Sequence, residues 1–436
     1  MKHIFTISFC LIIGLFMSGN LYSQSGWFPL SSGTYSNLYS CSFSDVNTGY
    51  VVGDAGIFLK TTNGGINWSI NTYIADGYLR SVCFINTNTG YICGDSAYSS
   101  DFIWKTTNGG VNWSRLYQTS QMFFYSIYFY NLNTGYTAAS NGFILRTSNG
   151  GINWSQISIG GFIPVTSIIF PTSDTGYLTS GILDLGGAIS KSTNAGLNWS
   201  NINTTSIPLN SVYFLNSSTG YAVGGQYDIG PLIVKTINGG TNWQTQVSPQ
   251  NYDVYTDIVF TDTITGYCSG HGILKTTNKG INWNYQINSY NSIYKLSMLN
   301  SSTGYAVGGN GTILKTTTGG DPVGIKPISN EIPKSFSLYQ NYPNPFNPTT
   351  KIKFDVTSNV KREMSNVKLI VYDILGREAA SLVNEELKPG SYEYEWDGSG
   401  FASGVYFYRL TTGDASSPDG IGTGPLSITK KMVLLR

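Results

Sequence analysis

Short runs of alternating apolar and polar residues, separated by Gly and Asn, fill the chain from about residue 27 to residue 320. The first complete unit runs through Leu38–Phe43, Tyr50–Gly53 and Ile57–Thr61 to a glycine-rich turn that ends in Trp68. Alternation with a period of two predicts half-buried strands, and the Gly and Asn between them predict tight turns. Each unit therefore predicts four strands, and no run after the N-terminal segment has helical periodicity.

The same pattern recurs along the chain at intervals of 38 to 46 residues. Its first landmark is the tripeptide Thr-Gly-Tyr, found seven times, with glycines at Gly49, Gly90, Gly135, Gly176, Gly220, Gly266 and Gly304. Its second landmark is Asn-Trp, found six times, with indoles at Trp68, Trp113, Trp154, Trp199, Trp243 and Trp283. A repeat of this length is typical of a β-propeller blade.

The seventh unit stops at Thr318-Gly319-Gly320 and has no Trp of its own. Trp27 precedes Phe43 by 16 residues, the separation that also joins Trp68 to Phe84. The strand around Trp27 is therefore predicted to complete the last blade, so that main-chain hydrogen bonds close a seven-bladed propeller over residues 24–320. Closure removes sheet edges that would otherwise pair with other chains.

Beyond the repeats the composition changes, because all seven Glu of the chain lie at or after Glu331. Residues 321–334 are predicted to be a linker, and residues 335–436 a small Ig-like antiparallel sandwich. The fold class is therefore all-β. The predicted strands of the sandwich are Lys351–Val356, Val367–Tyr372, Gly390–Trp396, Gly404–Leu410 and Ser427–Leu435.

The N-terminus predicts a secretory signal peptide over residues 1–23. Lys2 and His3 precede an apolar run, Ile4–Phe16, that is too short to span a membrane as a helix. Small and polar residues follow up to Ser23. No stable membrane span is expected once this segment is removed.

The turn before each Trp has the form Thr-x-Asn-x-Gly-x-Asn-Trp, as in Thr61–Trp68. It resembles the Asp-box of bacterial neuraminidase repeats (BNR), with Asn63 where that motif usually has Asp. Together with the Thr-Gly-Tyr element, the region from residue 27 to 320 resembles the Ycf48-like photosystem II assembly propellers. The resemblance implies an architecture but no one activity, because such repeats occur in enzymes and in assembly factors.

The C-terminal region resembles the type A sorting domain of the type IX secretion system. The motifs that carry the likeness are Gln340–Pro348, Val371–Arg377, Trp396–Gly398, Ser403–Leu410 and Lys430–Met432. The resemblance implies export through the type IX machinery to the outside or outer-membrane surface of a Gram-negative bacterium. The residues expected to serve this sorting signal are Gly404, Val405, Tyr406, Lys430 and Lys431.

Catalytic chemistry finds little support in the repeats. A sialidase site needs an arginine triad and a Glu-activated Tyr, but residues 24–320 contain three Arg and no Glu. The eleven Asp of this region leave open a glycoside hydrolase that uses an Asp pair on the variable loops. His271 lacks a ligand or triad pattern around it and is interpreted as a turn residue, and no metal or cofactor site is predicted.

The four exported cysteines, Cys41, Cys83, Cys93 and Cys268, match no zinc spacing. They are interpreted as buried free thiols, although Cys83 and Cys93 flank one turn on adjacent strands. A facing pair, and with it a disulfide, is the alternative that the sequence leaves open.

Binding is the preferred function. The net charge of +1 gives no electrostatic basis for binding nucleic acid. The repeated turns are expected at one end of the ring and the variable loops at the other, where Tyr side chains suit a glycan or protein ligand. The candidate binding residues are Tyr78, Tyr98, Tyr117, Tyr227, Tyr252, Tyr255, Tyr290 and Tyr294.

Overall fold

The computed structural model describes residues 26–435 except 72–73, 75–76, 97–99, 162, 247–252, 290, 322–324, 330, 358–364, 399–400 and 413–425. The predicted signal peptide lies outside the described residues. The chain forms two compact units, Met1–Asp321 and Pro322–Arg436. Among the described residues, no helix is long and apolar enough to cross a bilayer.

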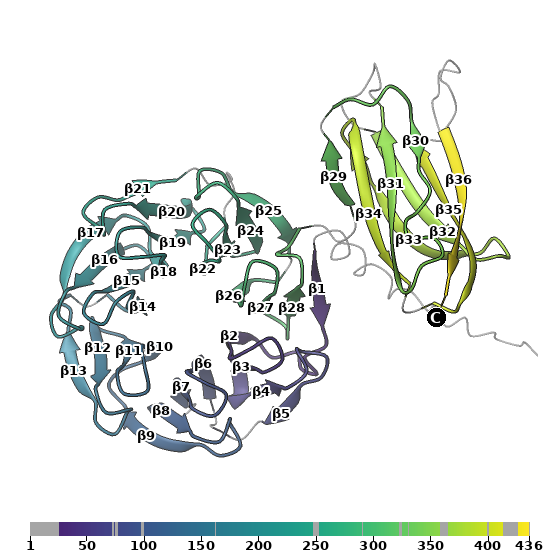
Figure 1. Ribbon diagram of the computed structural model, residues 1–436. Helices are drawn as coiled ribbons and strands as arrows, with labels where there is room; N and C mark the ends of the chain where they lie inside the picture. The colour runs from purple at the N-terminus through teal and green to yellow at the C-terminus, as the bar shows by residue number, and fades with distance from the viewer. Residues whose placement is uncertain are drawn as a thin grey trace, which may run out of the picture. The chain divides into compact units, whose positions relative to one another are not determined.

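The first unit is a ring of seven four-stranded antiparallel sheets arranged as blades around a common axis (Figure 1). Blades one to three comprise β2 (Leu38–Phe43), β3 (Gly49–Gly53), β4 (Phe58–Thr61) and β5 (Ser69–Asn71); β6 (Gly77–Phe84), β7 (Gly90–Ser96), β8 (Asp101–Thr106) and β9 (Ser114–Thr119); and β10 (Phe124–Phe129), β11 (Gly135–Ala139), β12 (Phe143–Thr147) and β13 (Ser155–Ser158).

Blades four to six comprise β14 (Val165–Ile169), β15 (Gly176–Ile182), β16 (Gly186–Ser192) and β17 (Ser200–Thr205); β18 (Leu209–Phe214), β19 (Gly220–Gln226), β20 (Gly230–Thr236) and β21 (Gln244–Thr245); and β22 (Asp257–Phe260), β23 (Gly266–Ser269), β24 (Gly272–Thr276) and β25 (Asn284–Asn288). The seventh comprises β26 (Ile293–Met298), β27 (Gly304–Gly308), β28 (Ile313–Thr316) and β1 (Trp27–Leu30). One 3-10 turn, η1 (Asp54–Gly56), follows β3.

The strand β1 closes the ring. It pairs antiparallel with β28, and Trp27 lies opposite Thr316. The Trp27 indole is fully buried and meets Tyr267 of blade six edge to face, with ring centroids 6.3 Å apart. The two ends of the repeat region therefore share one hydrophobic core as well as one hydrogen-bonded sheet.

Aromatic residues of the repeat join each blade to the next. Tyr50 of blade one stacks on Phe84 of blade two with centroids 3.4 Å apart, and Trp113 meets Phe84 edge to face at 6.0 Å. The same set closes the circle, because Tyr305 of blade seven stacks on Phe43 of blade one at 3.7 Å. The Trp residues thus belong to the cores between blades, where aromatic packing adds to burial.

In each blade a Tyr hydroxyl donates to a carbonyl in a repeated turn of the following blade. A Lys of the same blade, or Arg146 in blade three, also contacts the glycine-rich turn of the following blade. In blade two the Tyr91 hydroxyl and the Lys105 ammonium both donate to the Gly150 carbonyl, each at 3.0 Å. Blade seven repeats this on blade one, since Tyr305 and Lys315 donate to the Gly64 carbonyl at 3.1 and 2.8 Å. The conserved period of the chain is therefore also the period of its inter-blade contacts.

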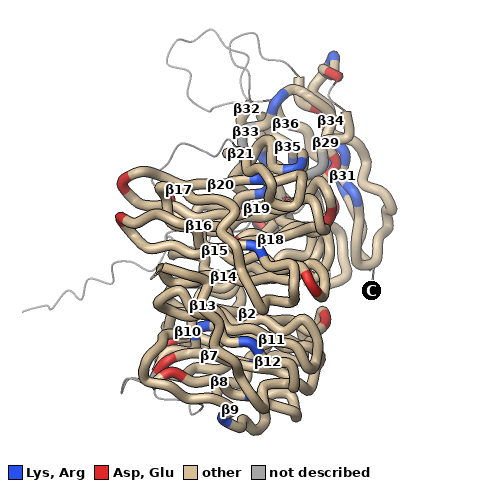
Figure 2. Tube along the Cα trace, turned by 90° about the vertical axis from the view of Figure 1, so that its left-hand side faces the viewer, with Lys and Arg blue, Asp and Glu red and all other residues tan. Residues whose placement is uncertain are grey.

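The two repeated turns of a blade lie at the same end of the ring. The Gly64 N–H donates to the Asn47 carbonyl at 2.8 Å, and equivalent bonds join Gly109 to Asn88 and Gly150 to Asn133. We call this end the repeat face and the opposite end, with the loops of unequal length, the variable face. Two long hairpins, β15–β16 and β19–β20, project from one edge of the ring in the side view of Figure 2.

The second unit consists of two four-stranded antiparallel sheets around one core. The first has the order β29 (Ile325–Ser329), β34 (Gly390–Asp397), β31 (Thr349–Val356) and β30 (Ser337–Leu338), and the second β33 (Glu378–Leu387), β32 (Ser365–Tyr372), β35 (Gly404–Thr412) and β36 (Leu426–Leu434). Buried residues of both sheets, including Ile352, Phe354, Leu369, Val371 and Tyr408, pack together.

The expected linker needs correction, and of the two interpretations of the cysteines the free thiols are confirmed while the facing pair is not. The expected linker, 321–334, contains the strand β29, which pairs with β34 and so belongs to the sandwich. Pro327 within it is tolerated because β29 is an edge strand. Cys83 and Cys93 do not face each other either, since Cys83 lies opposite Tyr91 and Cys93 opposite Ser81, and all four described cysteines are free thiols.

Candidate ligand-binding face

The innermost strands of the blades carry a β-bulge at their variable-face ends. The register shifts at one residue in six of the seven inner strands. In the remaining strand, the equivalent residue is Thr256, directly before β22. A bulge turns its extra side chain away from the regular pleat. We call these seven positions the inner rim: Tyr39, Arg80, Tyr125, Thr166, Asn210, Thr256 and Tyr294.

Three adjacent rim residues serve the fold. Thr166, Asn210 and Thr256 each donate a side-chain hydrogen bond to a main-chain carbonyl of the next blade. The acceptors are the carbonyls of Leu209 at 2.8 Å, Tyr255 at 2.8 Å and Ile293 at 2.5 Å. The hydrogen bonds of these three side chains therefore join blades four to seven.

The other four rim residues are three tyrosines and an arginine, contributed by blades seven, one, two and three. The Tyr39 and Tyr294 rings lie 5.5 Å apart between centroids. The Arg80 guanidinium lies over the Tyr39 ring at 5.4 Å and over the neighbouring Tyr78 ring at 4.8 Å. Tyr78 and Tyr125 are 43% and 38% exposed, so aromatic surface remains open to solvent. Tyr39, Tyr78, Arg80, Tyr125 and Tyr294 are called the aromatic arc below.

Two carboxylates hold residues of the aromatic arc in place. The Tyr39 hydroxyl donates to Asp54 at 2.5 Å, and Arg80 forms an ion pair with Asp95 at 3.0 Å. Burial, followed by the charge of Asp54, raises the pKa of the Tyr294 hydroxyl, and Tyr227 raises it further. These tyrosines therefore stay neutral and present both a ring face and a hydroxyl, which suits stacking and hydrogen bonding.

Asp101 is the most unusual acid of this face. It lies opposite Asp95 across β7 and β8, is 3% exposed, and one of its carboxylate oxygens has no hydrogen-bond partner. Burial, followed by the charge of Asp95, raises the pKa of Asp101 to about 7. Two carboxyl groups side by side cannot both be ionised cheaply, so Asp95 holds the charge that Arg80 balances.

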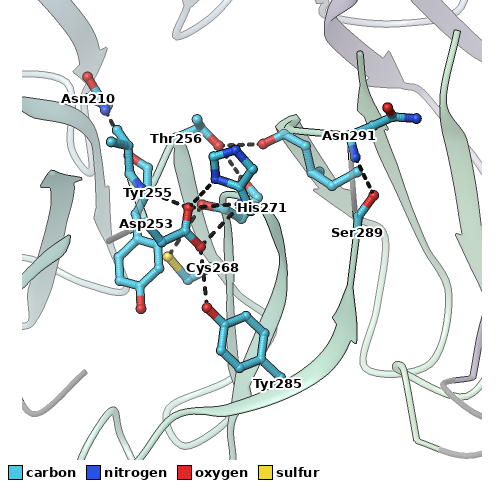
Figure 3. Close-up of polar contacts among 12 residues, drawn as sticks. Asn210, Asp253, Tyr255, Thr256, Cys268, His271, Tyr285, Ser289 and Asn291 are labelled. Carbon is cyan, nitrogen blue, oxygen red and sulfur yellow. Dashed lines mark hydrogen bonds and ion pairs between the residues drawn. The ribbon is translucent and has the colours of Figure 1, made fainter. Parts of the chain in front are cut away.

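A second polar cluster lies in blade six (Figure 3). The buried Asp253 accepts hydrogen bonds from the His271 N–H and contacts the His271 ring Nδ1 at 2.8 Å, and the Tyr285 hydroxyl donates to it at 3.3 Å. A side chain at Gly270 would meet both Asp253 oxygens at 2.9 Å, so the turn requires Gly there. No Ser or Cys side chain of the described residues forms a hydrogen bond with Asp253 or with the His271 ring, and His271 lies in the turn before β24.

The candidate tyrosines fall into distinct places. Tyr78 and Tyr294 belong to the aromatic arc, and Tyr227, 56% exposed, lies 6.1 Å from the His271 ring. Tyr117 is half-buried on β9 beside Phe124. Tyr98, Tyr252 and Tyr290 lie outside the described residues.

Tyr255 corrects the expectation that it is a surface residue. It is fully buried in the core between blades five and six with Ile258 and Phe260. The loop position suggested exposure, but the chain there turns its aromatic residue inward.

Sequence reasoning missed Tyr39 and Arg80 as members of a site. The signal was present: each stands directly before the serine of the inner strand, Ser40 or Ser81, where the register shifts. A period-two reading assigns these residues to a regular strand and does not show that a bulge redirects them.

The predicted sorting residues lie on the last two strands of the sandwich. Gly404, Val405 and Tyr406 begin β35 and pair with Leu434, Val433 and Met432 of β36, which also carries Lys430 and Lys431. The proline-rich segment Gln340–Pro348 lies along β36: Gln340 donates to the Lys431 carbonyl at 2.8 Å, and the Val433 N–H donates to Asn344 at 3.0 Å. Three of the separate motifs thus meet along β36, at one edge of the sheet.

Comparisons with known proteins agree with both units. The family model of the photosynthesis system II assembly factor YCF48 matches residues 20–122 and 74–207. A model described as secretion system C-terminal sorting domain matches residues 340–419. The chain carries Ycf48-like BNR repeats and a secretion sorting domain. The sorting match includes Gly404, Val405 and Tyr406 but ends before Lys430 and Lys431.

Individual relatives share part of the repeat region. The photosystem II assembly lipoprotein Ycf48 of Prochlorococcus marinus (strain MIT 9313) is 34% identical over 73 residues, which cover 15% of this chain and 22% of that protein. The chain thus matches about a fifth of this curated relative.

Solved structures extend the likeness to the fold of the whole ring. YCF48 bound to D1 peptide has a TM-score of 0.56 and 20% identity, covering 69% of this chain and 98% of that one. YCF48 from Cyanidioschyzon merolae has a TM-score of 0.55 and 20% identity, covering 66% and 98%. The repeat region is therefore a β-propeller, and the sorting domain directs type IX export to a secreted or cell-surface location.

Proposed function

We propose that the propeller is a non-catalytic binding module that holds a glycan or protein ligand against the aromatic arc of its variable face. The observation that carries the proposal is the division of the inner rim. Three blades use the rim residue to bind the next blade, whereas four consecutive blades place Tyr or Arg there. Exposed Tyr rings backed by fixed carboxylates are typical of sites that stack sugars or pack against peptides.

The proposed location is the outside or outer-membrane surface of a Gram-negative bacterium, with the type IX secretion machinery as the export partner. The joined motifs of the sorting domain support this partner, because Gln340–Pro348 and the last strand form one surface. Lys430 and Lys431 stand half-buried and exposed on that strand, where a receptor can reach them.

The alternative is a polysaccharide hydrolase, and the facing pair Asp95 and Asp101 is the observation that favours it. The raised pKa of Asp101 is a property of a general acid. A glycosidase acid must however reach the leaving oxygen, and Asp101 is 3% exposed while Asp95 is held by Arg80. The geometry therefore supports binding better than hydrolysis.

The test is a combined glycan and peptide array with the mature protein, followed by measurement of reducing-sugar release from each glycan that is bound. Retention of a ligand with no release of sugar is the expected result. Steady release of reducing ends, abolished in Asp101→Asn, would establish the hydrolase instead. No retention on any array would remove the support for the binding module.

A further inference from the structure

On the repeat face, a depression lies at the junction of blades five and six. It has a volume of about 210 Å³, is open to solvent, and is lined by Leu215, Asn216, Thr219, Tyr221, Lys235, Ile237, Thr263 and Lys279. It is remote from the aromatic arc, because the repeated turns form its walls.

Two of the lining residues depart from the repeat of this chain. The turn position occupied by Ile237 is Ser or Thr in the other six units. The position of Lys279 is Gly in five other units and Ala195 in the sixth. Both departures meet in one depression, although they belong to different blades.

Lys279 also occupies a backbone conformation that disfavours a long side chain. Its φ is +63°, in the left-handed region that Gly adopts without cost. A non-glycine residue held there is a strained feature, and such features cluster at functional sites. The conformation of the turn does not require Lys at this position, because Gly forms the same turn in five other units.

The second lysine, Lys235, is held close by. Its ammonium donates to the Lys279 carbonyl at 2.7 Å and lies 5.3 Å from the centre of the Tyr221 ring. Burial, and then the charge of Lys279, lower the pKa of Lys235. Asp262, in the Thr-Gly-Tyr turn of blade six, accepts from the N–H groups of Ile264 and Thr265, each at 2.7 Å, and among the described residues it forms no ion pair with either lysine.

We infer that this depression binds a small organic oxyanion, whose carboxylate or phosphate group lies between Lys235 and Lys279 and whose apolar part contacts Ile237 and Leu215. An anion placed between the side chains of two lysines that line one depression is stabilised by both charges. The hydroxyls and amide of Thr219, Thr263 and Asn216 supply further polar groups. The apolar wall distinguishes the site from one for a bare inorganic ion.

The test uses the full mature chain and four probes: acetate, benzoate, inorganic phosphate and phenyl phosphate, each titrated by calorimetry at low salt. The aromatic member of each pair is expected to bind at least about tenfold more tightly than its small counterpart. Comparison of benzoate with phenyl phosphate then decides which anionic group the site prefers.

The repeat provides its own variants. Lys279→Gly restores the residue of five other turns and relieves the positive φ, so folding is expected to be kept while binding falls at least about tenfold. Ile237→Thr should remove the preference for the aromatic probes but keep phosphate binding. Lys368→Ala, which removes one positive charge from the exposed surface of the sandwich, should leave every affinity unchanged.

Equal affinities in the parent chain and Lys279→Gly would overturn the inference, as would the absence of saturable binding by any probe up to about 10 mM. A loss of binding in Lys368→Ala as large as in Lys279→Gly would reduce the effect to net charge and overturn it too. The outcome is independent of the binding function proposed for the aromatic arc, because the site lies on the other face.

Discussion

Asp257 and Lys295 occupy an inner-strand position that is Ser in the other five blades. Ser40 and Ser81 accept a main-chain N–H of the next blade, from Val82 at 3.3 Å and Ile127 at 3.2 Å, and Ser211 donates to Asp257 at 2.8 Å. Asp257 accepts from the Leu296 N–H at 3.0 Å and from the Lys295 ammonium at 2.9 Å. Burial would lower the pKa of Lys295, but Asp257 outweighs it and raises that pKa.

Lys295→Met should therefore destabilise the propeller by about 1–3 kcal/mol, because Asp257 is left buried without its counter-ion, although the Lys295 side chain is 41% exposed. Urea denaturation of the propeller unit measures this change. The double variant Asp257→Ser/Lys295→Ser restores the repeat residue at both sites and should recover most of the loss. A double variant no more stable than Lys295→Met would show that the ion pair is not the cause.

Asp101 predicts a pH dependence of stability. Its folded pKa, about 7, lies above the value of about 3.9 for an unfolded Asp, so the stability it contributes is complete below pH 4 and is lost as the pH rises through 7. The difference in the free energy of unfolding between Asp101→Asn and the parent chain should therefore shift in favour of the variant by about 1–3 kcal/mol between pH 5 and pH 8. Thermal unfolding at the two pH values checks the sign, and Asp45→Asn, on the exposed repeat face, serves as the control.

At the residue scale, the sequence predicted tyrosine as the residue type of the binding surface better than it predicted which tyrosines are exposed. Tyr78 and Tyr294 were expected at a binding surface and do belong to the aromatic arc, whereas Tyr255 is buried. Loop residues of one type differ in exposure because packing against the next blade decides which ring turns inward, and one-dimensional patterns do not contain that contact.

Among the elements, the short strand β1 joins the two ends of the repeat region. Four residues complete a sheet and place Trp27 in the core of the last blade. The separation of Trp27 from Phe43 indicated this pairing, because it equals the separation of Trp68 from Phe84 within the repeats. The edge strand β29 had no such periodic signal, and Pro327 argued against a strand. The bulges did follow the recurring inner-strand serine, but alternation alone does not show that the residue before it is redirected.

Trp27→Ala should lower the free energy of unfolding of the propeller by about 3–5 kcal/mol through the cavity it leaves. Denaturation monitored by circular dichroism measures it. Tyr35→Ala, at a ring that is 92% exposed in the adjoining loop, should change stability by less than about 0.5 kcal/mol. Similar values for the two variants would contradict a closing role for β1.

At the scale of the whole molecule, the two compact units contain different features. The propeller unit contains the aromatic arc and every inter-blade contact, and the sandwich unit contains the sorting motifs. The sequence indicated both units because each has its own periodicity and composition. Their ligands could not be derived in the same way, since the arc arises only when the last blade meets the first three blades around one axis.

A chain ending at Asp321 should keep the folded propeller, with its melting temperature unchanged within about 2 °C, but should accumulate in the periplasm. Fractionation of cells with immunoblotting measures the location. Lys430→Ala/Lys431→Ala in the full chain should reduce export with the sandwich still folded. Appearance of the truncated chain outside the cell at the level of the full chain would contradict the role of the sorting domain.

The account depends most on the aromatic arc being the ligand site. The decisive measurement is the affinity for the glycan or peptide retained on the array, compared between the parent chain, Tyr78→Ala/Tyr294→Ala, and Ile66→Ala/Ile152→Ala on the repeat face, where both Ile are exposed. The account predicts at least about a tenfold loss in the first double variant and no change in the second. Unchanged affinity in Tyr78→Ala/Tyr294→Ala would contradict it.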